Sequence, residues 1–139
     1  MTMTTAHNPV TRLTTEQCWE LLASSRFGRL ATRGGDTVQI VPTHYIVDGR
    51  SVLFRAGAGS TLLDLAIDDA VALEIDSHGP FTAWSVVIQG VAHILDDVAE
   101  ISAAEKLALD PWPGSEDAAW VRITPATVSG RHFMLHEAL

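Results

Sequence analysis

Two glycine turn signals enclose a long run of β-branched residues, and they restrict this chain to folds built from hairpins. Gly34-Gly35-Asp36 precedes the run at residues 38–47, and Asp48-Gly49 follows it. β-Branched runs separated by such turns are typical of antiparallel strands. Pro42 lies inside the run. Because proline has no N–H to donate to a ladder, Pro42 marks a bulge, an edge or a place where pairing stops.

The rest of the chain alternates between further extended runs and three short helical segments. We expect helices over residues 14–24, 60–67 and 97–109, and further strands over residues 28–32, 51–55, 71–76, 84–95, 120–124 and 130–136. The order lacks the regular strand–helix–strand alternation of a doubly wound parallel fold. Six or seven strands with several hairpins favour a small closed barrel, because closure removes exposed strand edges.

Two of the helices have patterns that predict how they begin and pack. Thr14 and Gln17 have the spacing of a capping box, and Leu13 can contact Cys18 across the helix start. We expect this first helix to bury Cys18, Leu21 and Leu22. The helix over residues 60–67 has a predicted apolar stripe of Leu62, Leu63, Ala66 and Ile67.

Composition limits the domain count and the classes of partner. The length of 139 residues and the 47% hydrophobic content predict one domain with its own core, residues 13–139, after a flexible tail over residues 1–12. A net charge of -8 without a Lys/Arg cluster argues against nucleic acid. The lone Cys18, the lack of a signal-peptide pattern and the lack of an apolar run of about 20 residues predict a cytoplasmic protein that does not enter a membrane.

One strand end leads into a loop of small residues that can receive an anion. Phe54-Arg55 is followed by Ala56-Gly57-Ala58-Gly59-Ser60-Thr61, which opens a helix. Such a strand–loop–helix presents backbone N–H groups to a phosphate, and Arg55 can add forked hydrogen bonds. Without other information an Arg in this position is more often an exposed surface residue than a ligand-binding one, and Ser60 is as suited to capping the helix as to binding a ligand. The pattern makes a phosphorylated cofactor the first hypothesis.

Histidines and tryptophans supply further candidate ligands. His44 lies in the middle of an apolar strand, where it could hydrogen-bond a cofactor, ligate haem iron or be a satisfied strand histidine. His132 and His136 share one strand face without carboxylate or cysteine companions, so we expect no metal site. Trp84, Trp112 and Trp120 could stack on a cofactor or fill the core, and Trp112, between two prolines, is the best ligand candidate among them.

Several segments follow one another in an order typical of a known family. They are Cys18-Trp19-Glu20-Leu21-Leu22, Gly28-Arg29-Leu30-Ala31, Val41-Pro42-Thr43-His44-Tyr45-Ile46-Val47-Asp48-Gly49, Leu53-Phe54-Arg55 and Gly59-Ser60-Thr61-Leu62. The order continues with Val71-Ala72-Leu73-Glu74-Ile75-Asp76, Trp84-Ser85-Val86-Val87-Ile88-Gln89-Gly90, Pro111-Trp112 and Trp120-Val121-Arg122-Ile123-Thr124-Pro125. Through these colinear segments the chain resembles the pyridoxamine 5'-phosphate oxidase-like family of flavin-binding split barrels.

The resemblance implies a mainly β (α+β) fold, a six- to seven-stranded antiparallel split β-barrel with three short helices. It also implies a homodimer with two flavin mononucleotides (FMN), each in a groove between subunits. By the same resemblance the phosphate lies near Phe54, Arg55, Ala56, Ser60, Thr61 and Leu62. The flavin ring lies along Pro42, Thr43, His44 and Tyr45, with Trp84 and Ser85 nearby. The chain departs from the family pattern at Thr61, where the family has lysine, and at His44, where asparagine is usual.

These inferences predict an FMN-dependent oxidoreductase that acts on a small molecule. In that reading the flavin carries the electrons or hydride, which explains why no catalytic acid–base pair or nucleophile is evident in the sequence. Three alternatives remain. Ser60-Thr61 favours a deazaflavin-dependent reductase, His44 or a C-terminal histidine would suit a haem-binding split barrel, and the missing lysine favours a non-enzymatic cofactor-binding or sequestering protein.

Overall fold

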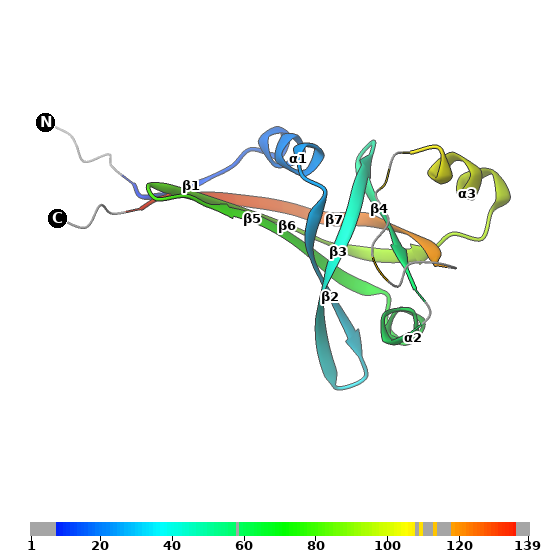
Figure 1. The fold of residues 1–139 in the computed structure, drawn as a ribbon. Coiled ribbons are helices and arrows are strands. Elements are labelled where there is room, and N and C mark those ends of the chain that lie inside the picture. Colours follow the sequence, from blue (N-terminus) through cyan, green and yellow to red (C-terminus); the bar gives the residue numbers. More distant parts are fainter. Residues whose placement is uncertain (1–7, 58, 108, 110–112, 114–117, 136–139) are drawn as a thin grey trace, which may run out of the picture.

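The computed structural model describes residues 8–57, 59–107, 109, 113 and 118–135, which form one antiparallel sheet and three helices (Figure 1). The strands are β1 (Val10–Arg12), β2 (Phe27–Gly34), β3 (Thr37–Asp48), β4 (Ser51–Ala56), β5 (Ala70–His78), β6 (Thr82–Ile94) and β7 (Ala119–Met134). The helices are α1 (Thr15–Ser24), α2 (Ser60–Ile67) and α3 (Val98–Glu105). None of the described helices is both long and apolar enough to cross a membrane.

The sheet closes on itself, as the fold prediction requires. Its strand order is β1-β7-β4-β3-β2-β5-β6, and β6 also pairs with β7. Strands β2 to β7 therefore form a ring, and β1 adds a seventh strand to β7. All the pairings are antiparallel. The predicted mainly β split barrel with three short helices is confirmed.

The ring is split between β3 and β4. Strand β3 pairs with β4 only from Tyr45 to Asp48, whereas its pairing with β2 runs from Thr37 to His44. Beyond Tyr45 the two strands diverge, and β4 stays paired with β7 as far as Ala56. Pro42 lies in the part of β3 that has a partner on one side only. Of the three roles considered for Pro42, the structure selects the edge, because a missing N–H there breaks no ladder.

Strand β7 is continuous where the sequence predicted two strands, over residues 120–124 and 130–136. Opposite Gln89 and Gly90 of β6 the register shifts, which leaves Ala126 without a counterpart in a β-bulge. A Cβ at Gly90 would collide with the Thr124 carbonyl, so the two backbones approach too closely for any other residue. The bulge explains why the local sequence pattern predicted a break at residues 125–129.

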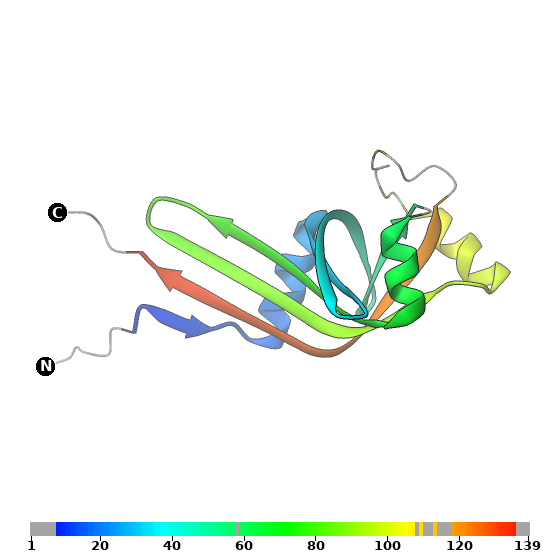
Figure 2. The ribbon, with the colours of Figure 1, turned by 90° about the horizontal axis from the view of Figure 1, so that it is seen from below.

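The predicted tail over residues 1–12 ends in a short strand that sequence analysis missed. Val10 of β1 lies opposite Phe133 of β7, and Arg12 lies opposite Arg131. Residues 1–7 lie outside the described part of the chain. Figure 2 shows β1 beside the far end of β7, at the end of the molecule away from α3. A pairing between the two ends of the chain leaves no local signal.

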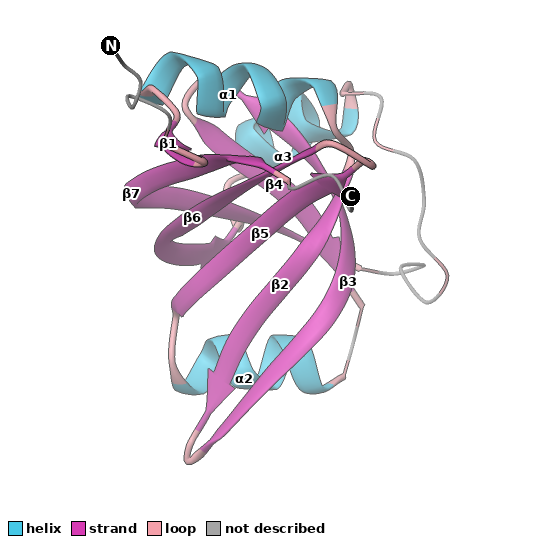
Figure 3. Cartoon of the chain, turned by 90° about the vertical axis from the view of Figure 1, so that its left-hand side faces the viewer, coloured by secondary structure: helices cyan, strands magenta, loops and turns pink. Residues whose placement is uncertain are grey.

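Helix α1 covers one side of the barrel and contributes to the core (Figure 3). Its capping box is confirmed, because the Thr14 hydroxyl accepts from the Gln17 N–H and the Gln17 side chain accepts from the Thr14 N–H. The predicted buried set is partly wrong. Cys18 and Leu22 are buried, but Trp19 takes the place predicted for Leu21, which is only half-buried. The largest fully buried side chains in the core are Tyr45, Phe54, Leu22, Leu30, Leu73, Ile75, Ile88 and Ile123.

Helix α2 has the predicted bounds but a different buried face. Leu63 and Ile67 are 66% and 67% exposed and Ala66 is also exposed, whereas Asp64 and Leu65 are buried and Leu62 is half-buried. The Asp64 carboxylate accepts a hydrogen bond from the Thr32 hydroxyl of β2 at 2.9 Å. A buried carboxylate needs such a partner, and this contact turns the helix so that part of the predicted stripe faces solvent.

Helix α3 ends at Glu105, earlier than the predicted residue 109. The Asp97 side chain caps it by accepting from the Glu100 N–H, as expected for an Asp at that position. The chain then turns, with the Leu107 N–H donating to the Ala104 carbonyl. Helix α3 covers a second, smaller core cluster on the outside of β4 and β7, formed by Leu53, Leu95, Ala104 and Trp120.

Candidate functional site

The divergence of β3 and β4 leaves a cavity of about 300 Å³, which we call the split cleft. It lies between the unpaired edge of β3, the end of β4 and the first turn of α2. Its lining comprises Leu30, Val41, Pro42, Thr43, His44, Phe54, Arg55, Ala56 and Thr61. The structure therefore brings together residues that the sequence assigned to the two ends of one ligand: Pro42, Thr43 and His44 at one end, and Phe54, Arg55, Ala56 and Thr61 at the other.

The other predicted site residues lie elsewhere. Tyr45 is fully buried in the core, where its hydroxyl donates to the Leu22 carbonyl at 2.8 Å and burial raises its pKa to about 12. Leu62 packs against the core. Trp84 and Ser85 lie on β6, three places from β3 in the sheet order, and do not line the cleft. Trp112 lies outside the described residues.

Arg55 is the most unusual polar group of the cleft. Its Nε atom is buried, yet no described residue hydrogen-bonds to it. Arg29, Arg33, Arg50 and Arg122, by contrast, each form an ion pair with a carboxylate. A buried donor without an acceptor costs about 1–3 kcal/mol, and more when the group is charged. Arg55 thus has the features expected of a residue whose acceptor is an external anion.

The first turn of α2 adds a second positive element to the same cleft. The predicted cap Ser60 is instead the first helical residue, and the N-cap is Gly59, which has no side chain to bond the free N–H groups. The first turn contains no acidic residue. The N–H groups of a first helical turn have no acceptor within the helix and carry a partial positive charge. Because Thr61 lines the cleft, this helix end and Arg55 face one cavity.

The edge of β3 forms the opposite wall of the cleft. The Tyr45 N–H donates to the Arg26 carbonyl, on the β2 side. Since neighbouring residues of an antiparallel strand direct their backbone groups to alternate sides, the groups of Pro42 and His44 point away from β2, towards the split. The His44 ring also meets the Phe27 ring edge-on, at 5.8 Å between centroids. This wall offers backbone hydrogen-bonding groups to a flat ligand, with an imidazole beside them.

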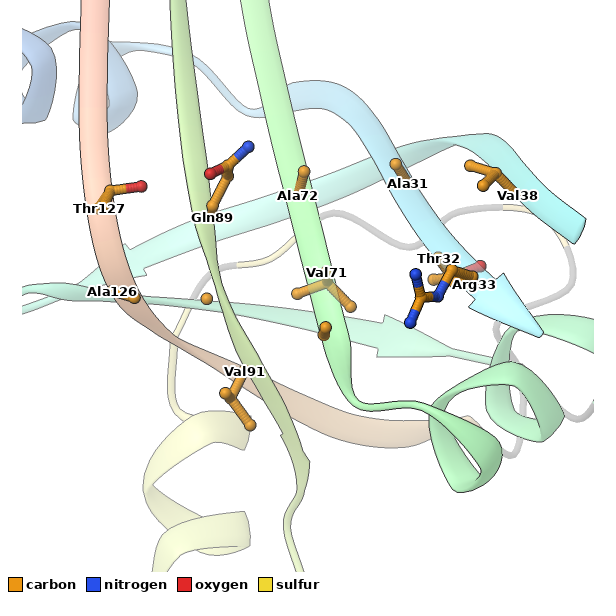
Figure 4. A pocket seen from close by; sticks show the side chains of 12 residues that line it. Ala31, Thr32, Arg33, Val38, Val71, Ala72, Gln89, Val91, Ala126 and Thr127 are labelled. Carbon is orange, nitrogen blue, oxygen red and sulfur yellow. The ribbon is translucent and has the colours of Figure 1, made fainter. Parts of the chain in front are cut away.

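A larger groove, missed by sequence analysis, lies on the outer face of the sheet and has a volume of about 570 Å³ (Figure 4). Small residues from four strands keep it shallow, among them Ala31, Ala72 and Ala126. Arg33 lines this outer groove, but the Asp68 carboxylate binds its guanidinium at 2.8 Å. The outer groove therefore lacks the unsatisfied charge that distinguishes the split cleft.

A smaller cavity of about 370 Å³ adjoins the outer groove and shares Ala31 and Ala72 with it. Within it Arg29 binds Glu74 and Asp76 at 2.9 and 2.7 Å. Burial raises the pKa of Glu74, and a hydrogen bond from Glu74 lowers the pKa of Asp76. Over the described part of the chain, no group of three or more His, Cys, Asp or Glu residues is arranged to hold a metal ion.

Residues 14–132 match the family model described as pyridoxamine 5'-phosphate oxidase. The chain belongs to this family. An uncharacterised protein of Mycobacterium tuberculosis is 38% identical over 88 residues, which make up 63% of this chain and 80% of that protein. A crystal structure from Corynebacterium glutamicum, described as a candidate pyridoxamine 5'-phosphate oxidase, is 33% identical with a TM-score of 0.82, over 94% of this chain and 98% of that one.

A second solved structure in the comparison is the FAD binding protein of Mycobacterium smegmatis. It is 33% identical, with a TM-score of 0.76, over 89% of this chain and 98% of that one. The resemblance inferred from the sequence is thereby confirmed at the level of the family and the fold. Both positions at which this member departs from the family pattern, Thr61 and His44, line the split cleft.

Proposed function

We propose that this chain is a cytoplasmic, FMN-dependent oxidoreductase that binds its flavin in the split cleft. The Arg55 Nε, which is buried and has no acceptor among the described residues, is the observation that carries the proposal, because a phosphate would supply such an acceptor. The FAD binding protein of Mycobacterium smegmatis, which has the same fold at 33% identity, supports a flavin as the ligand class.

The phosphate binds between Arg55 and the first turn of α2. Arg55 contributes the charge, the free N–H groups of the turn contribute hydrogen bonds, and the Thr61 hydroxyl contributes a neutral donor where the family has lysine. The cleft volume of about 300 Å³ lies at the low end of the range for ligand sites.

The polar edge of the ring lies along the Pro42–His44 wall. There the backbone groups that point away from β2 fix its orientation, and the His44 imidazole replaces the usual amide as its neighbour. A bound flavin supplies hydride and electron transfer, which explains why the chain needs no nucleophile of its own. The work of the described residues is to bind, orient and shield the ring for a small-molecule substrate.

The active form proposed here is a homodimer. The outer groove is bordered by apolar side chains that face solvent in the single chain: Val38 is 65% exposed, and Val91 is 47% exposed. Ile40, 67% exposed, lies over the adjoining cavity. Such a surface favours burial against a second copy, for which a two-fold dimer is the commonest arrangement. Light scattering at low micromolar concentration should give twice the mass of the chain, and a monomer there would contradict the dimer.

The absorption spectrum of the purified protein, combined with mass spectrometry of what denaturation releases, tests the cofactor. The proposal predicts flavin absorption and the mass of FMN. Release of a deazaflavin or of haem would replace FMN with the corresponding alternative. A colourless protein that also fails to bind added FMN would favour the non-enzymatic reading and overturn the proposal.

A further inference from the structure

We propose that Trp120 is a positioning residue that holds the Arg55 guanidinium in place for the phosphate, an inference that rests on the proposed function. Arg55 of β4 and Trp120 of β7 are direct cross-strand partners. The guanidinium carbon of Arg55 lies over the Trp120 ring, 5.2 Å from its centroid. The ring and the charge thus form one unit across two paired strands.

Stacking on an aromatic face suits a guanidinium that must bind an anion. The attraction acts between the charge and the ring face, so it uses none of the five N–H donors, which lie in the guanidinium plane. A carboxylate partner would hold the side chain equally well, but it would occupy those donors and repel a phosphate. Trp120 therefore restricts the long Arg55 side chain while leaving its hydrogen-bonding capacity for the ligand.

The Trp120 ring is itself held by apolar packing. It is 6% exposed and belongs to the cluster of Leu53, Leu95 and Ala104 beneath α3. Its backbone carbonyl accepts from the Leu95 N–H at 2.9 Å, whereas its indole Nε1 has no hydrogen-bond partner within the described residues. Packing, and not a hydrogen bond of the indole, fixes the ring. The packing of α3 on this cluster thereby helps to fix the ring on which Arg55 stacks.

A second stack in the same molecule shows what the Arg55 pair lacks. Arg50 lies over the Trp19 ring at 5.3 Å, almost the same distance, but the Glu16 carboxylate binds its guanidinium. Trp19 is 7% exposed, so the two rings are equally buried. The stacks differ in whether the charge already has a carboxylate partner. The Arg50–Trp19 pair is therefore a matched control for a merely structural stack.

The test measures dissociation constants of FMN and riboflavin with apo-protein, by quenching of flavin fluorescence. The ratio of riboflavin to FMN dissociation constants isolates the phosphate contribution from any general loss of packing. Trp120→Leu should lower this ratio about ten-fold, as expected for a desolvated cation–π contact. Trp120→Phe keeps a ring face and should keep the ratio within about three-fold of the wild type. Trp19→Leu should leave it unchanged.

A double-mutant cycle tests whether Trp120 acts through Arg55. If it does, adding Trp120→Leu to Arg55→Ala changes the ratio no further. Should Trp120→Leu fold poorly by circular dichroism, Trp120→Met fills more of the space and must show the same loss. An unchanged ratio in the folded Leu or Met variant, an equal loss in Trp120→Phe, or additive effects in the double variant would overturn the positioning role. A wild-type ratio of one would instead refute the proposed phosphate site itself.

Discussion

The two arginine–tryptophan stacks lie in regions that treat their polar groups in opposite ways. On the α1 side, Arg50 rests on Trp19 and is bound by Glu16, and the buried Tyr45 hydroxyl donates to the Leu22 carbonyl. In the split cleft, Arg55 rests on Trp120 with a buried Nε that no described residue accepts from. The helix end beside it has no side-chain cap.

Polar residues that stabilise the fold differ from candidate ligand-binding residues in whether their polar groups have partners within the chain. Polar groups that are satisfied within the chain contribute to the free energy of folding, and they have few free donors or acceptors with which to bind a ligand. Polar groups left unsatisfied lower stability until a ligand pairs with them. By this criterion we expect the α1 side to be structural and the split cleft to be the binding site, although an arginine–tryptophan stack lies in each region.

Removing the unpaired charge should have the largest effect on binding. Arg55→Ala takes away charged hydrogen bonds worth about 1.5–3 kcal/mol, so the FMN dissociation constant should rise about 10- to 100-fold in a fluorescence titration. Riboflavin binding should stay within about two-fold of the wild type. An equal loss for both flavins would show that Arg55 supports the cleft without contacting the phosphate.

The matching change on the α1 side should alter stability and not binding. Tyr45→Phe removes the hydroxyl hydrogen bond to the Leu22 carbonyl, which still accepts from the Ser25 N–H, so the free energy of unfolding in urea should fall by about 0.5–1.5 kcal/mol. The ratio of riboflavin to FMN dissociation constants should not move. A marked change in that ratio would make Tyr45 part of the flavin site, as the family resemblance implied.

The raised pKa of Tyr45 predicts how the free energy of unfolding changes at alkaline pH. Burial raises its pKa from 10.0 to about 12, so the folded state favours the neutral phenol. This contribution is fully present below the unfolded pKa and is lost as pH rises between about 10 and 12. Over that interval the wild type should lose more stability than Tyr45→Phe. Parallel urea midpoints for the two proteins would contradict the assignment.

Adding a charge to the cleft should change the FMN dissociation constant by a smaller factor than removing Arg55. Thr61→Lys replaces a neutral hydrogen bond with a charged one, a difference on the order of 1 kcal/mol or about five-fold in the FMN dissociation constant. The gain should be greatest at low salt and absent for riboflavin. Leu63→Lys is the matched control, because it adds the same charge to the exposed side of α2. Equal tightening by both variants would indicate a general charge effect.

The smallest effect on stability and binding should come from replacing Arg50, whose charge is already paired with Glu16. Arg50→Ala removes a stack and an ion pair whose side chains are 55% and 76% exposed, and such surface pairs contribute about 0–1 kcal/mol. The urea midpoint should shift slightly, and the titration with FMN should be indistinguishable from that of the wild type. Weaker FMN binding by Arg50→Ala would remove the distinction between the two stacks.

The sequence predicted the parts of this molecule that depend on neighbouring residues. The capping box of Thr14 and Gln17 and the bounds of α2 each follow from a local pattern that the structure confirms, whereas for Pro42 the sequence left three roles open and the structure selects the edge. Strand pairing between distant segments was not predictable in this way. The β1–β7 pair and the unbroken β7 depend on contacts that no local window contains.

The same division holds within the candidate site. Arg55, Thr61 and the strand around His44 were identified from the sequence, partly through the family resemblance, and all of them line the cleft. The contact of Arg55 with Trp120 was not foreseen, because their pairing depends on the register of β4 against β7. The buried face of α2 was also misjudged, since an apolar stripe does not reveal that Asp64 bonds Thr32.

Whether the split cleft binds a flavin through its phosphate can be tested by comparing FMN with riboflavin on the wild-type apo-protein. The two ligands share the ring and the ribityl chain and differ only in the group assigned to Arg55 and the first turn of α2. FMN should bind at least about ten-fold more tightly than riboflavin, with a difference that shrinks as salt is added. Equal dissociation constants for the two flavins would contradict it.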